Sequence, residues 1–501
     1  MRHAPLAPIP VRVVAAVRVV AAVAAVAGLT VASLSYAAPP APPAPPARRA
    51  PPPSAPSKPS PPAQMHLDVR QAKLDNGLRV VMSVDHTSPT IAVDVVYDVG
   101  GRNEERGHAG FAHLFEHMMF QGSANVARGS HFQLVTSHGG TLNGTTSSDR
   151  TNYFELMPQS ELALALWLEA DRMKSLDISQ KNLENQRAVV KEEFRMRVDN
   201  RPYVPASIRL QEMVFQGYFA YEHSAIGNMR DLDAAQLEWV KSFHDAYYAP
   251  NNAVLAIAGD FDPDAALAMV HKYFDSARAQ PSVPKYAPGA LAEQTSPREA
   301  VMEDTHAKLP AILYGWAIPA KRDKDHYALE MAALLLAGGE SSRLHRALVR
   351  EQSIASEVEA GTNDHRGPDM FEIVVKLSGT GSVAKAQKLV DGELQNIVRL
   401  GPSDADMEKL KNQTAHGFLF GLQSNFARAQ ELAEFELYSG DAKLLNDELA
   451  RYLAVTKDDI KHVVATYLTR ARRSQIEVKP APTPTPTPPT PSAGNPSKGT
   501  P

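Results

Sequence analysis

Short apolar runs and longer amphipathic segments alternate along the chain from about residue 65. In the first part of the chain, alternating or continuous apolar runs predict β-strands at 69–74, 78–84, 91–99, 151–156 and 252–258. Apolar residues spaced three and four apart predict helices at 161–174, 179–198, 206–215, 234–247 and 263–274. Asp75-Asn76-Gly77 joins the first two strands and is a strong hairpin signal. The pattern therefore predicts an α+β unit over residues 65–279.

The second part of the chain repeats this rhythm after a proline-containing segment at 280–297, which predicts a linker between domains. Beyond it we expect strands at 311–318, 370–377 and 474–478. Helical pattern is expected at 326–350, interrupted by Gly338-Gly339, and at 383–400, 405–426 and onward to about 467. The fold expected is α+β. Two homologous domains, 65–279 and 298–479, each carry helices packed on a mainly antiparallel sheet, and together they enclose a cavity.

The two ends of the chain predict export rather than folded structure. Three arginines precede an apolar run at 19–34, and Ser35-Tyr36-Ala37 then offers small residues to a signal peptidase. Residues 1–37 are therefore expected to be a signal peptide, with an uncleaved membrane anchor as the alternative. The Pro/Ala-rich segment 38–64 and the Pro/Thr-rich tail 480–501 predict disordered, semi-rigid arms without a core. We expect a periplasmic or secreted protein, with no stable membrane span after signal cleavage.

Composition removes several classes of function. The net charge of −4 is too close to neutral to indicate nucleic-acid binding. The chain contains no cysteine, which excludes thiolate zinc sites, disulfides, a cysteine nucleophile and an acylated lipoprotein cysteine. Any metal ligands must therefore be His, Asp or Glu side chains.

The clearest chemical signal is the stretch His113-Leu114-Phe115-Glu116-His117. On a helix, residues four apart share a face, so His113 and His117 can direct two imidazoles at one ion. Glu116 lies between them, where a general base for a bound water belongs. The alternative is a polar stripe on a surface helix. Because residues 111–120 are apolar on most of the circumference, a buried helix is favoured, and its polar groups then need a partner such as a metal.

Two histidines leave a catalytic metal site incomplete, because such a site needs a third protein ligand and an open position. The helix expected at 179–198 offers Glu184, Glu192 and Glu193. Adjacent helical residues point about 100° apart, so Glu192 and Glu193 cannot both face one ion. Spacing alone does not choose between them, and a solvated helix face is the simpler interpretation of this glutamate pair.

Further motifs accompany the histidine pair. They are Gly107-x-x-Gly110 before it, Phe120-x-Gly122 after it, Asn143-Gly144-Thr145, Thr151-x-Tyr153, Gln186-Arg187-x-Val189-Val190-x-x-Glu193, Tyr248-x-Pro250-x-Asn252 and Gly259-Asp260. Together they resemble the pitrilysin-type inverzincin metallopeptidases, which include insulin-degrading enzyme and the mitochondrial processing peptidase, over residues 65–478. The resemblance implies one Zn²⁺ per chain, held by His113, His117 and Glu193, with Glu116 as the base.

The same resemblance implies how a peptide substrate binds. The family adds the substrate as a β-strand to an edge strand, which here would span residues 139–146. Asn143, Gly144 and Thr145 are then expected to contact the substrate, with Asn143 the side chain closest to the chemistry. The sequence does not distinguish zinc from manganese or cobalt, although three N/O ligands with an open position suit zinc.

Two departures from the family pattern matter. A glutamate seven residues before the ligand glutamate is Gln186 here, and an amide supports a ligating histidine without bringing charge. An Arg and a Tyr that commonly face the zinc from the second domain are replaced by Val349 and Ser356, with Arg350 one position away. In two-subunit members a homologous chain without zinc supplies that pair. We therefore expect this chain to be the zinc subunit of a heterodimer.

Three functions compete at this point. The first is a zinc endopeptidase that hydrolyses peptides or unfolded segments. The second is a non-catalytic scaffold or binding subunit of the same family, and the third is an envelope-binding protein that uses its Pro-rich arms. All four residues of the expected site are present, and this favours the peptidase.

Overall fold

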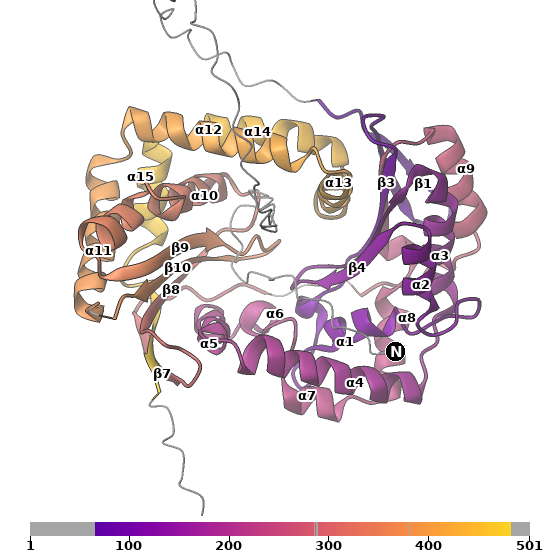
Figure 1. Cartoon of the computed structure of the whole chain (residues 1–501), viewed down its shortest axis with the longest axis horizontal. Helices are drawn as coiled ribbons and strands as arrows, with labels where there is room; N and C mark the ends of the chain where they lie inside the picture. The colour runs from indigo at the N-terminus through magenta and orange to yellow at the C-terminus, as the bar shows by residue number, and fades with distance from the viewer. Residues whose placement is uncertain (1–65, 285, 287–288, 380, 482–501) are drawn as a thin grey trace, which may run out of the picture.

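The computed structural model describes residues 66–284, 286, 289–379 and 381–481 (Figure 1). The predicted signal peptide, the Pro-rich spacer and the second tail beyond residue 481 lie outside the described residues. No helix of the described part is both long and apolar enough to cross a membrane.

The first half of the chain begins with three strands and then alternates helices and strands. Its elements are β1 (Arg70–Lys73), β2 (Arg79–Val84), β3 (Thr90–Tyr97), η1 (Gly101–Asn103), α1 (Phe111–Met118), α2 (Ser130–Ser137), β4 (Thr141–Thr146), β5 (Thr151–Pro158), η2 (Gln159–Glu161), α3 (Leu162–Ser175), α4 (Gln180–Phe194), η3 (Arg195–Asp199), α5 (Val204–Val214), α6 (Phe219–Glu222), α7 (Met229–Ala234), α8 (Leu237–Tyr247), η4 (Pro250–Asn252), β6 (Ala253–Gly259) and α9 (Pro263–Phe274).

The second half is richer in helices toward its end. Its elements are β7 (Arg298–Asp304), β8 (Ala311–Ile318), α10 (Lys324–Ala337), η5 (His345–Glu351), β9 (Ala355–Thr362), β10 (Asp369–Leu377), α11 (Val383–Leu400), α12 (Asp404–Gly421), α13 (Asn425–Ser439), η6 (Ala442–Leu444), α14 (Leu445–Ala454), α15 (Lys457–Tyr467) and β11 (Ser474–Pro480).

The two sheets share one topology. The first has the order β1-β2-β6-β3-β5-β4, and the second has the order β7-β11-β8-β10-β9. Apart from the extra strand β1, each half places its last strand beside its first strand in parallel, and the remaining pairs are antiparallel. The expectation of two homologous α+β domains with mainly antiparallel sheets is therefore confirmed. The predicted hairpin at Asn76-Gly77 joins β1 to β2, and Gly77 adopts φ +90°, which favours glycine.

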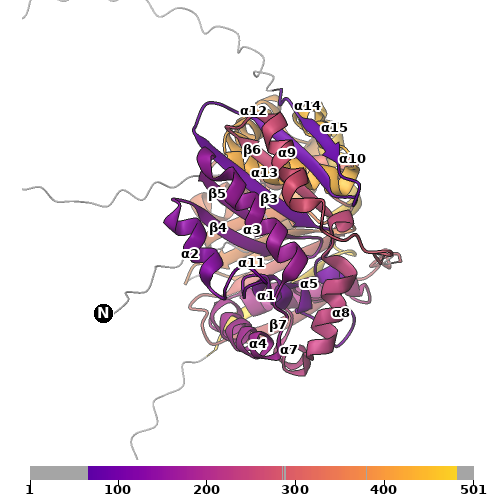
Figure 2. The same ribbon diagram turned by 90° about the vertical axis from the view of Figure 1, so that its right-hand side faces the viewer.

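Both faces of each sheet are buried. On β3, Val93 and Val95 belong to the core shared with α1, α3 and α9, whereas Ala92 and Val96 belong to a different core on the opposite face. Figure 2 shows α3 and α9 lying across one face of the first sheet. Strands buried on both faces are expected to be apolar throughout, which explains runs such as the one in β6.

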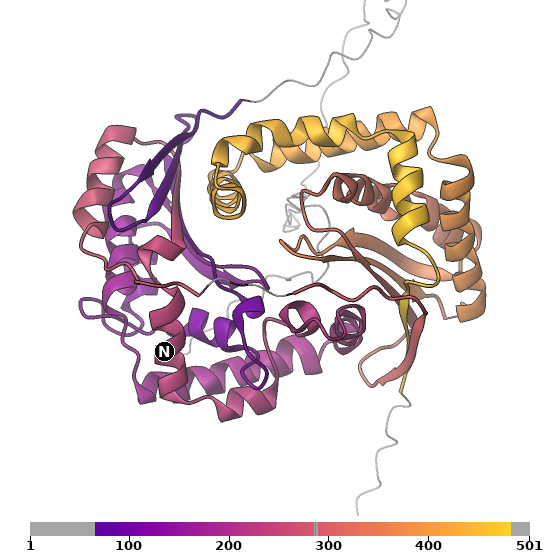
Figure 3. The same cartoon turned by 180° about the vertical axis from the view of Figure 1, so that it is seen from behind.

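The opposite face of each sheet is covered by a helix from the other half of the chain. Helix α13 packs on β2, β3 and β6, where Leu432 and Ala433 join the core of Ala92 and Val96. Helix α5 packs on β8 and β11, where Leu210 joins the core formed by those strands. Figures 1 and 3 show α13 against the inner side of the first sheet, from both sides of the molecule. Each half therefore completes the core of the other, and this fixes how the two sheets face each other.

The structure adds elements that the hydrophobic pattern did not predict. Helix α2, strand β7 and strand β9 are extra. The helical region expected at 326–350, with its interruption at Gly338-Gly339, is observed as α10, which ends at Ala337, and the π-helical segment η5. Strand β7 is an edge strand whose residues are alternately exposed and partly exposed, so it carries charged residues in place of an apolar run. The helix expected at 179–198 ends as α4 at Phe194 and continues as the π-helical turn η3.

Candidate metal centre

Helix α1 is fixed at its N-terminus by a buried carboxylate. Glu104 accepts hydrogen bonds from the backbone N–H groups of Gly110 and Ala112, at 2.9 and 2.7 Å. A negative charge at this end of a helix is favourable, because the first N–H groups have no partner within the helix. Gly110 caps the helix with φ +93°, and a Cβ there would lie 2.8 Å from the carbonyl oxygen of Ile226. Glycine at this position therefore lets the start of α1 pack closely against the backbone of Ile226 and Gly227.

The two helices bring together the three ligands that the family resemblance implied. The Oε2 atom of Glu193 lies 3.1 Å from Nε2 of His117 and 3.8 Å from Nε2 of His113. Two atoms bound to one tetrahedral zinc at about 2.0–2.1 Å lie roughly 3.3 Å apart. The observed separations bracket that value, and the two imidazole rings are 4.8 Å apart at 75°. The donor set and its spacing therefore fit one divalent cation.

The alternative of a solvated polar stripe is excluded by burial. His113 and Glu193 are each 9% exposed, and Glu116 is 8% exposed. Nδ1 of His113 is buried and has no hydrogen-bond partner among the described residues. Glu192, the other glutamate considered from the sequence, is exposed and paired with Arg195. The choice between the two adjacent glutamates is thus made by the direction of α4.

Around the ligands lie one amide and one cation. The side chains of Gln186 and His117 are hydrogen-bonded to each other. Arg197, in the π-helical turn after α4, places NH1 2.8 Å from Oε1 of Glu193. Glu193 therefore turns one oxygen toward the histidines and the other toward Arg197.

Glu116 is held beside the histidine pair by strand β4. Its Oε2 accepts a hydrogen bond of 2.6 Å from the Thr146 hydroxyl. A Cβ on Gly144 would lie 3.1 Å from Oε1 of Glu116, so the strand passes directly over the carboxylate. Side chains alternate along a strand, so Thr146 and Gly144 face Glu116 while Asn143 and Thr145 face the opposite side. The hydroxyl that contacts the expected base is therefore that of Thr146.

Burial and neighbouring charge shift the pKa values of these groups in useful directions. Burial, reinforced by the nearby His117, lowers the pKa of His113 to about 4 and keeps it neutral, as a metal ligand must be. Burial raises the pKa of Glu116, although the Thr146 hydrogen bond opposes this. Burial alone would lower the pKa of His117, but its bond to Glu193 outweighs this and raises it. A cation bound here would take the place of the proton that His117 shares with Glu193.

Two other groups of metal-ligand residue types lie close together in the described part of the chain. His131, Glu155 and Glu169 form one group, but the guanidinium of Arg172 contacts both glutamates and occupies the cationic position between them. His326, Asp364 and Asp369 form the other, in the second half. There both ring nitrogens of His326 lie 2.9 Å from a carboxylate oxygen, so the imidazole is already paired.

The second half offers no Arg/Tyr pair at the expected positions. Val349 is partly buried against the second core, Arg350 is exposed, and Ser356 is an exposed residue of β9 whose hydroxyl bonds to the backbone of Lys376.

Comparison with known families agrees with this architecture. Residues 79–218 match the model described as insulinase (peptidase family M16), and residues 234–414 match the model described as the peptidase M16 inactive domain. The chain therefore belongs to peptidase family M16.

Proteins of known name and structure are similar over most of their length. A zinc protease, PqqE, from Helicobacter pylori is 29% identical over 421 residues, covering 83% of this chain and 94% of that protein. A probable mitochondrial-processing peptidase subunit beta from Arabidopsis thaliana is 23% identical, covering 80% of this chain and 76% of that protein. The crystal structure of a protease from Helicobacter pylori superposes with a TM-score of 0.78 at 28% identity, covering 83% of this chain and 100% of that one.

Three contacts of the site were not predicted from the sequence. The Thr146 bond to Glu116, the Arg197 bond to Glu193 and the Glu104 cap of α1 each join segments whose approach is set by the tertiary fold. Only the alternation of side chains on the edge strand, counted from Gly144, could have indicated Thr146.

Proposed function

We propose that this chain is a zinc-dependent endopeptidase that hydrolyses peptides or unfolded segments. The convergence of His113, His117 and Glu193 on one point, with Glu116 beside them, supports this most directly. Three N/O ligands favour zinc over a metal that prefers six oxygen ligands. When bound, the metal supplies Lewis acidity, which lowers the pKa of water toward neutrality and polarises a carbonyl group.

Glu116 moves the proton in this proposal. Its Oε2 is engaged by the Thr146 hydroxyl, so Oε1 is the atom that accepts a proton from the attacking water and returns it to the leaving amine. A pKa raised by burial makes the carboxylate a stronger base than an exposed glutamate. The Thr146 bond also fixes the plane of the carboxylate, so the base is held in advance in an orientation suited to proton transfer.

The peptide substrate is proposed to bind on strand β4. Among the described residues this strand pairs with β5 alone and forms one edge of its sheet, so its other side presents backbone N–H and C=O groups. An extended peptide can pair with these groups at Asn143, Gly144 and Thr145 with little demand on its side chains. Gly144 lies against Glu116, so the paired peptide passes beside the base.

We further propose that the chain acts with a homologous subunit without zinc, which supplies the Arg/Tyr pair missing at Val349 and Ser356. One relative is named as a subunit beta, and the fold of this chain matches 48% of the length of the periplasmic protease PqqL from Escherichia coli. Both observations are compatible with peptidases built from two such units. The proposed location is the periplasm or the exterior, on the basis of the N-terminal residues alone.

A peptidase assay with Glu116→Gln tests the catalytic proposal. The purified chain, with and without a co-expressed homologous partner, is incubated with an unstructured peptide after zinc loading. Loss of a general base typically costs about 10²–10⁴-fold in rate, so the variant should lose cleavage by that factor and retain zinc. Glu184→Gln, an exposed glutamate on α4, is the matched control.

The outcomes separate the alternatives. A wild-type chain that binds no zinc and cleaves nothing, with or without its partner, would favour the non-catalytic scaffold. Full activity of the chain alone would contradict the need for a partner while leaving the peptidase in place.

A further inference from the structure

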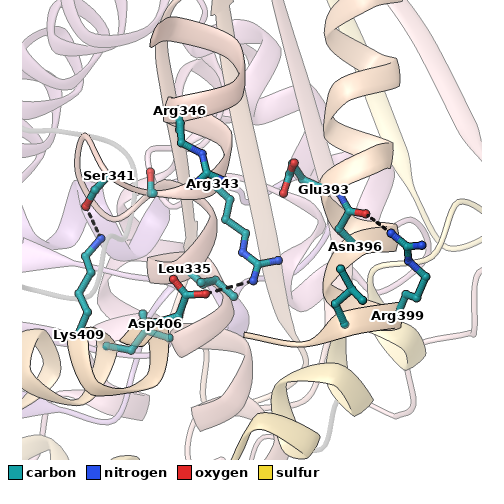
Figure 4. Close-up of a pocket in the computed structure, with 12 residues that line it drawn as sticks. Leu335, Ser341, Arg343, Arg346, Glu393, Asn396, Arg399, Asp406 and Lys409 are labelled. Atoms are coloured by element: carbon teal, nitrogen blue, oxygen red, sulfur yellow. Dashed lines mark hydrogen bonds and ion pairs between the residues drawn. The ribbon is translucent and has the colours of Figure 1, made fainter. Parts of the chain in front are cut away.

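The second half of the chain contains a pocket lined by cationic side chains. The candidate metal centre lies in the first half. The pocket opens between the loop after α10, the C-terminal part of α11 and helix α12, and its volume is about 410 Å³ (Figure 4). That volume falls within the range of about 300–1,000 Å³ typical of small-molecule sites.

Four cationic side chains from three segments line this pocket. Arg343 and Arg346 come from the loop and the following helix, Arg399 from α11 and Lys409 from α12. In Figure 4 they surround the opening from different sides, with Arg343 and Lys409 anchored to neighbouring side chains. Cations on several sides of one pocket favour an anion with several acceptor atoms.

Two acidic residues, Asp406 and Glu393, also line the pocket, and its four cations outnumber them. Asp406 accepts a hydrogen bond of 3.2 Å from Arg343 and also bonds to the backbone N–H of Ser403 at the start of α12. The Asp406 carboxylate is therefore already hydrogen-bonded within the chain. Glu393 is the remaining acidic residue of the lining, and it offers an acceptor to a ligand hydroxyl.

The cations keep donors for a ligand. Arg343 is only 15% exposed and bonds to Asp406 and to the carbonyl of Gly401 through NH2, which holds it in one orientation. Arg399 donates to the Asn396 side chain at 3.3 Å, and Arg346 pairs through Nε with Glu351 at 3.5 Å. Lys409 donates to the Ser341 hydroxyl at 2.7 Å. Each guanidinium has five N–H donors, and the bonds described here use only one or two of them. Several donors of each arginine are therefore left for other acceptors.

Ser342 supplies an independent indication of a ligand. It lines the pocket, is 2% exposed, and its hydroxyl has no hydrogen-bond partner among the described residues. Leaving a buried hydroxyl without a partner is unfavourable, so such groups usually bond to protein, water or a ligand. An acceptor oxygen in the pocket would satisfy this hydroxyl together with the neighbouring cations.

We propose that this pocket binds a phosphoryl-bearing anion. Guanidinium groups match phosphate oxygens in paired hydrogen bonds, and an ammonium and a hydroxyl complete a set typical of phosphate recognition. The volume exceeds that of a single phosphate, which favours a di- or triphosphate or the phosphorylated headgroup of a lipid. The exposed Leu400 at the rim, 67% of which is accessible, would lie beside the organic part of such a ligand.

Calorimetry of the full chain with inorganic phosphate, pyrophosphate and tripolyphosphate tests this proposal. Tripolyphosphate should bind once per chain, more tightly than phosphate and less tightly as salt rises. Each of Arg346→Gln and Arg399→Gln should weaken binding by about tenfold, the effect of losing a charge-assisted hydrogen bond. Arg451→Gln, an arginine that is also about half exposed but lies outside the pocket, should leave binding unchanged.

Two further arms complete the experiment. Binding that disappears when zinc is removed, or that survives in the Arg346→Gln/Arg399→Gln double variant, would overturn the proposal, as would equal affinity for citrate. Vesicles of phosphatidylglycerol, compared with phosphatidylcholine, identify the source of the phosphate. Retention on the former that needs Arg346 and Arg399 assigns a lipid headgroup, and binding of tripolyphosphate without such retention assigns a soluble anion.

Discussion

Helices α1 and α10 occupy equivalent places in two sheets of the same topology, yet α1 presents the candidate metal centre and α10 a buried ion cluster. Each follows the second strand of the shared order, β3 or β8, and packs on the edge strand, β4 or β9. Each also carries ligand-type residues at its third and seventh positions. In α1 these are His113 and His117, and in α10 they are His326 and Glu330.

The difference lies in what faces the imidazoles. Both ring nitrogens of His326 lie 2.9 Å from carboxylates, of Glu330 and Asp369. Burial opposes protonation, but these two partners raise the pKa of His326 to about 10, so it is an imidazolium without a lone pair for a metal. Burial lowers the pKa of His113 to about 4 and leaves it neutral. The same framework therefore holds a candidate metal centre in one half and a buried ion cluster in the other.

The largest expected effect is the loss of zinc affinity when the proposed ligand on α4 is changed. Glu193→Gln should reduce zinc affinity by more than about 100-fold, because loss of a supporting group alone costs about 10–100-fold. Zinc per chain after dialysis, measured by elemental analysis, checks this. Glu192→Gln, the adjacent exposed residue, should keep its zinc. Equal zinc loss in both variants would remove Glu193 from the centre.

The corresponding change in α10 should affect stability instead. His326→Gln leaves Asp369 and Glu330 buried without their shared cation, and breaking a buried ion pair costs about 3–5 kcal/mol. Urea unfolding of the zinc-free chain, followed by the fluorescence of the buried Trp316 in the same core, measures the loss. The zinc content should stay at the wild-type value. A variant that loses zinc would break the distinction between the two halves.

The ion cluster also predicts a pH dependence of stability. The pKa of His326 is raised from an unfolded value near 6.5 to about 10, so the folded state binds more protons between these limits. Its stabilising contribution is fully present below about pH 6.5 and is lost as the pH rises through about 10. The difference in unfolding free energy between wild type and His326→Gln should shrink over this range. A constant difference from pH 6 to 10 would mean that His326 is neutral.

The smallest expected effect is a change in zinc affinity caused by a residue next to the proposed ligands. Gln186→Glu places a carboxylate beside His117 and should tighten zinc binding by about tenfold, near the lower limit for supporting partners. Competition with a fluorescent zinc chelator measures this change. Gln133→Glu adds the same charge at an exposed position of α2 and should have little effect. Weaker binding by Gln186→Glu would show that the amide is already the better partner.

Much of the fold was accessible from hydrophobic periodicity. The strands β2, β3, β8 and β10 and the helices α3, α9 and α11 lie close to the predicted ranges, because apolar runs and amphipathic periods are local properties. Strand β7 was missed because an exposed edge strand carries charges where a buried strand carries apolar residues. The exchange of α5 and α13 between the halves was also missed, since an amphipathic helix does not specify which sheet it covers.

The sequence by itself determined which residue types are available as ligands and the turn-by-turn spacing of His113, Glu116 and His117, whereas Glu193 was indicated only through the family resemblance. The tertiary structure decided which of two adjacent glutamates faces the histidines, that Thr146 holds Glu116, and that His326 is paired rather than open. The physical reason is that spacing along a helix fixes directions within one element. The separation of a nitrogen from a carboxylate on another element depends on how whole sheets and helices pack.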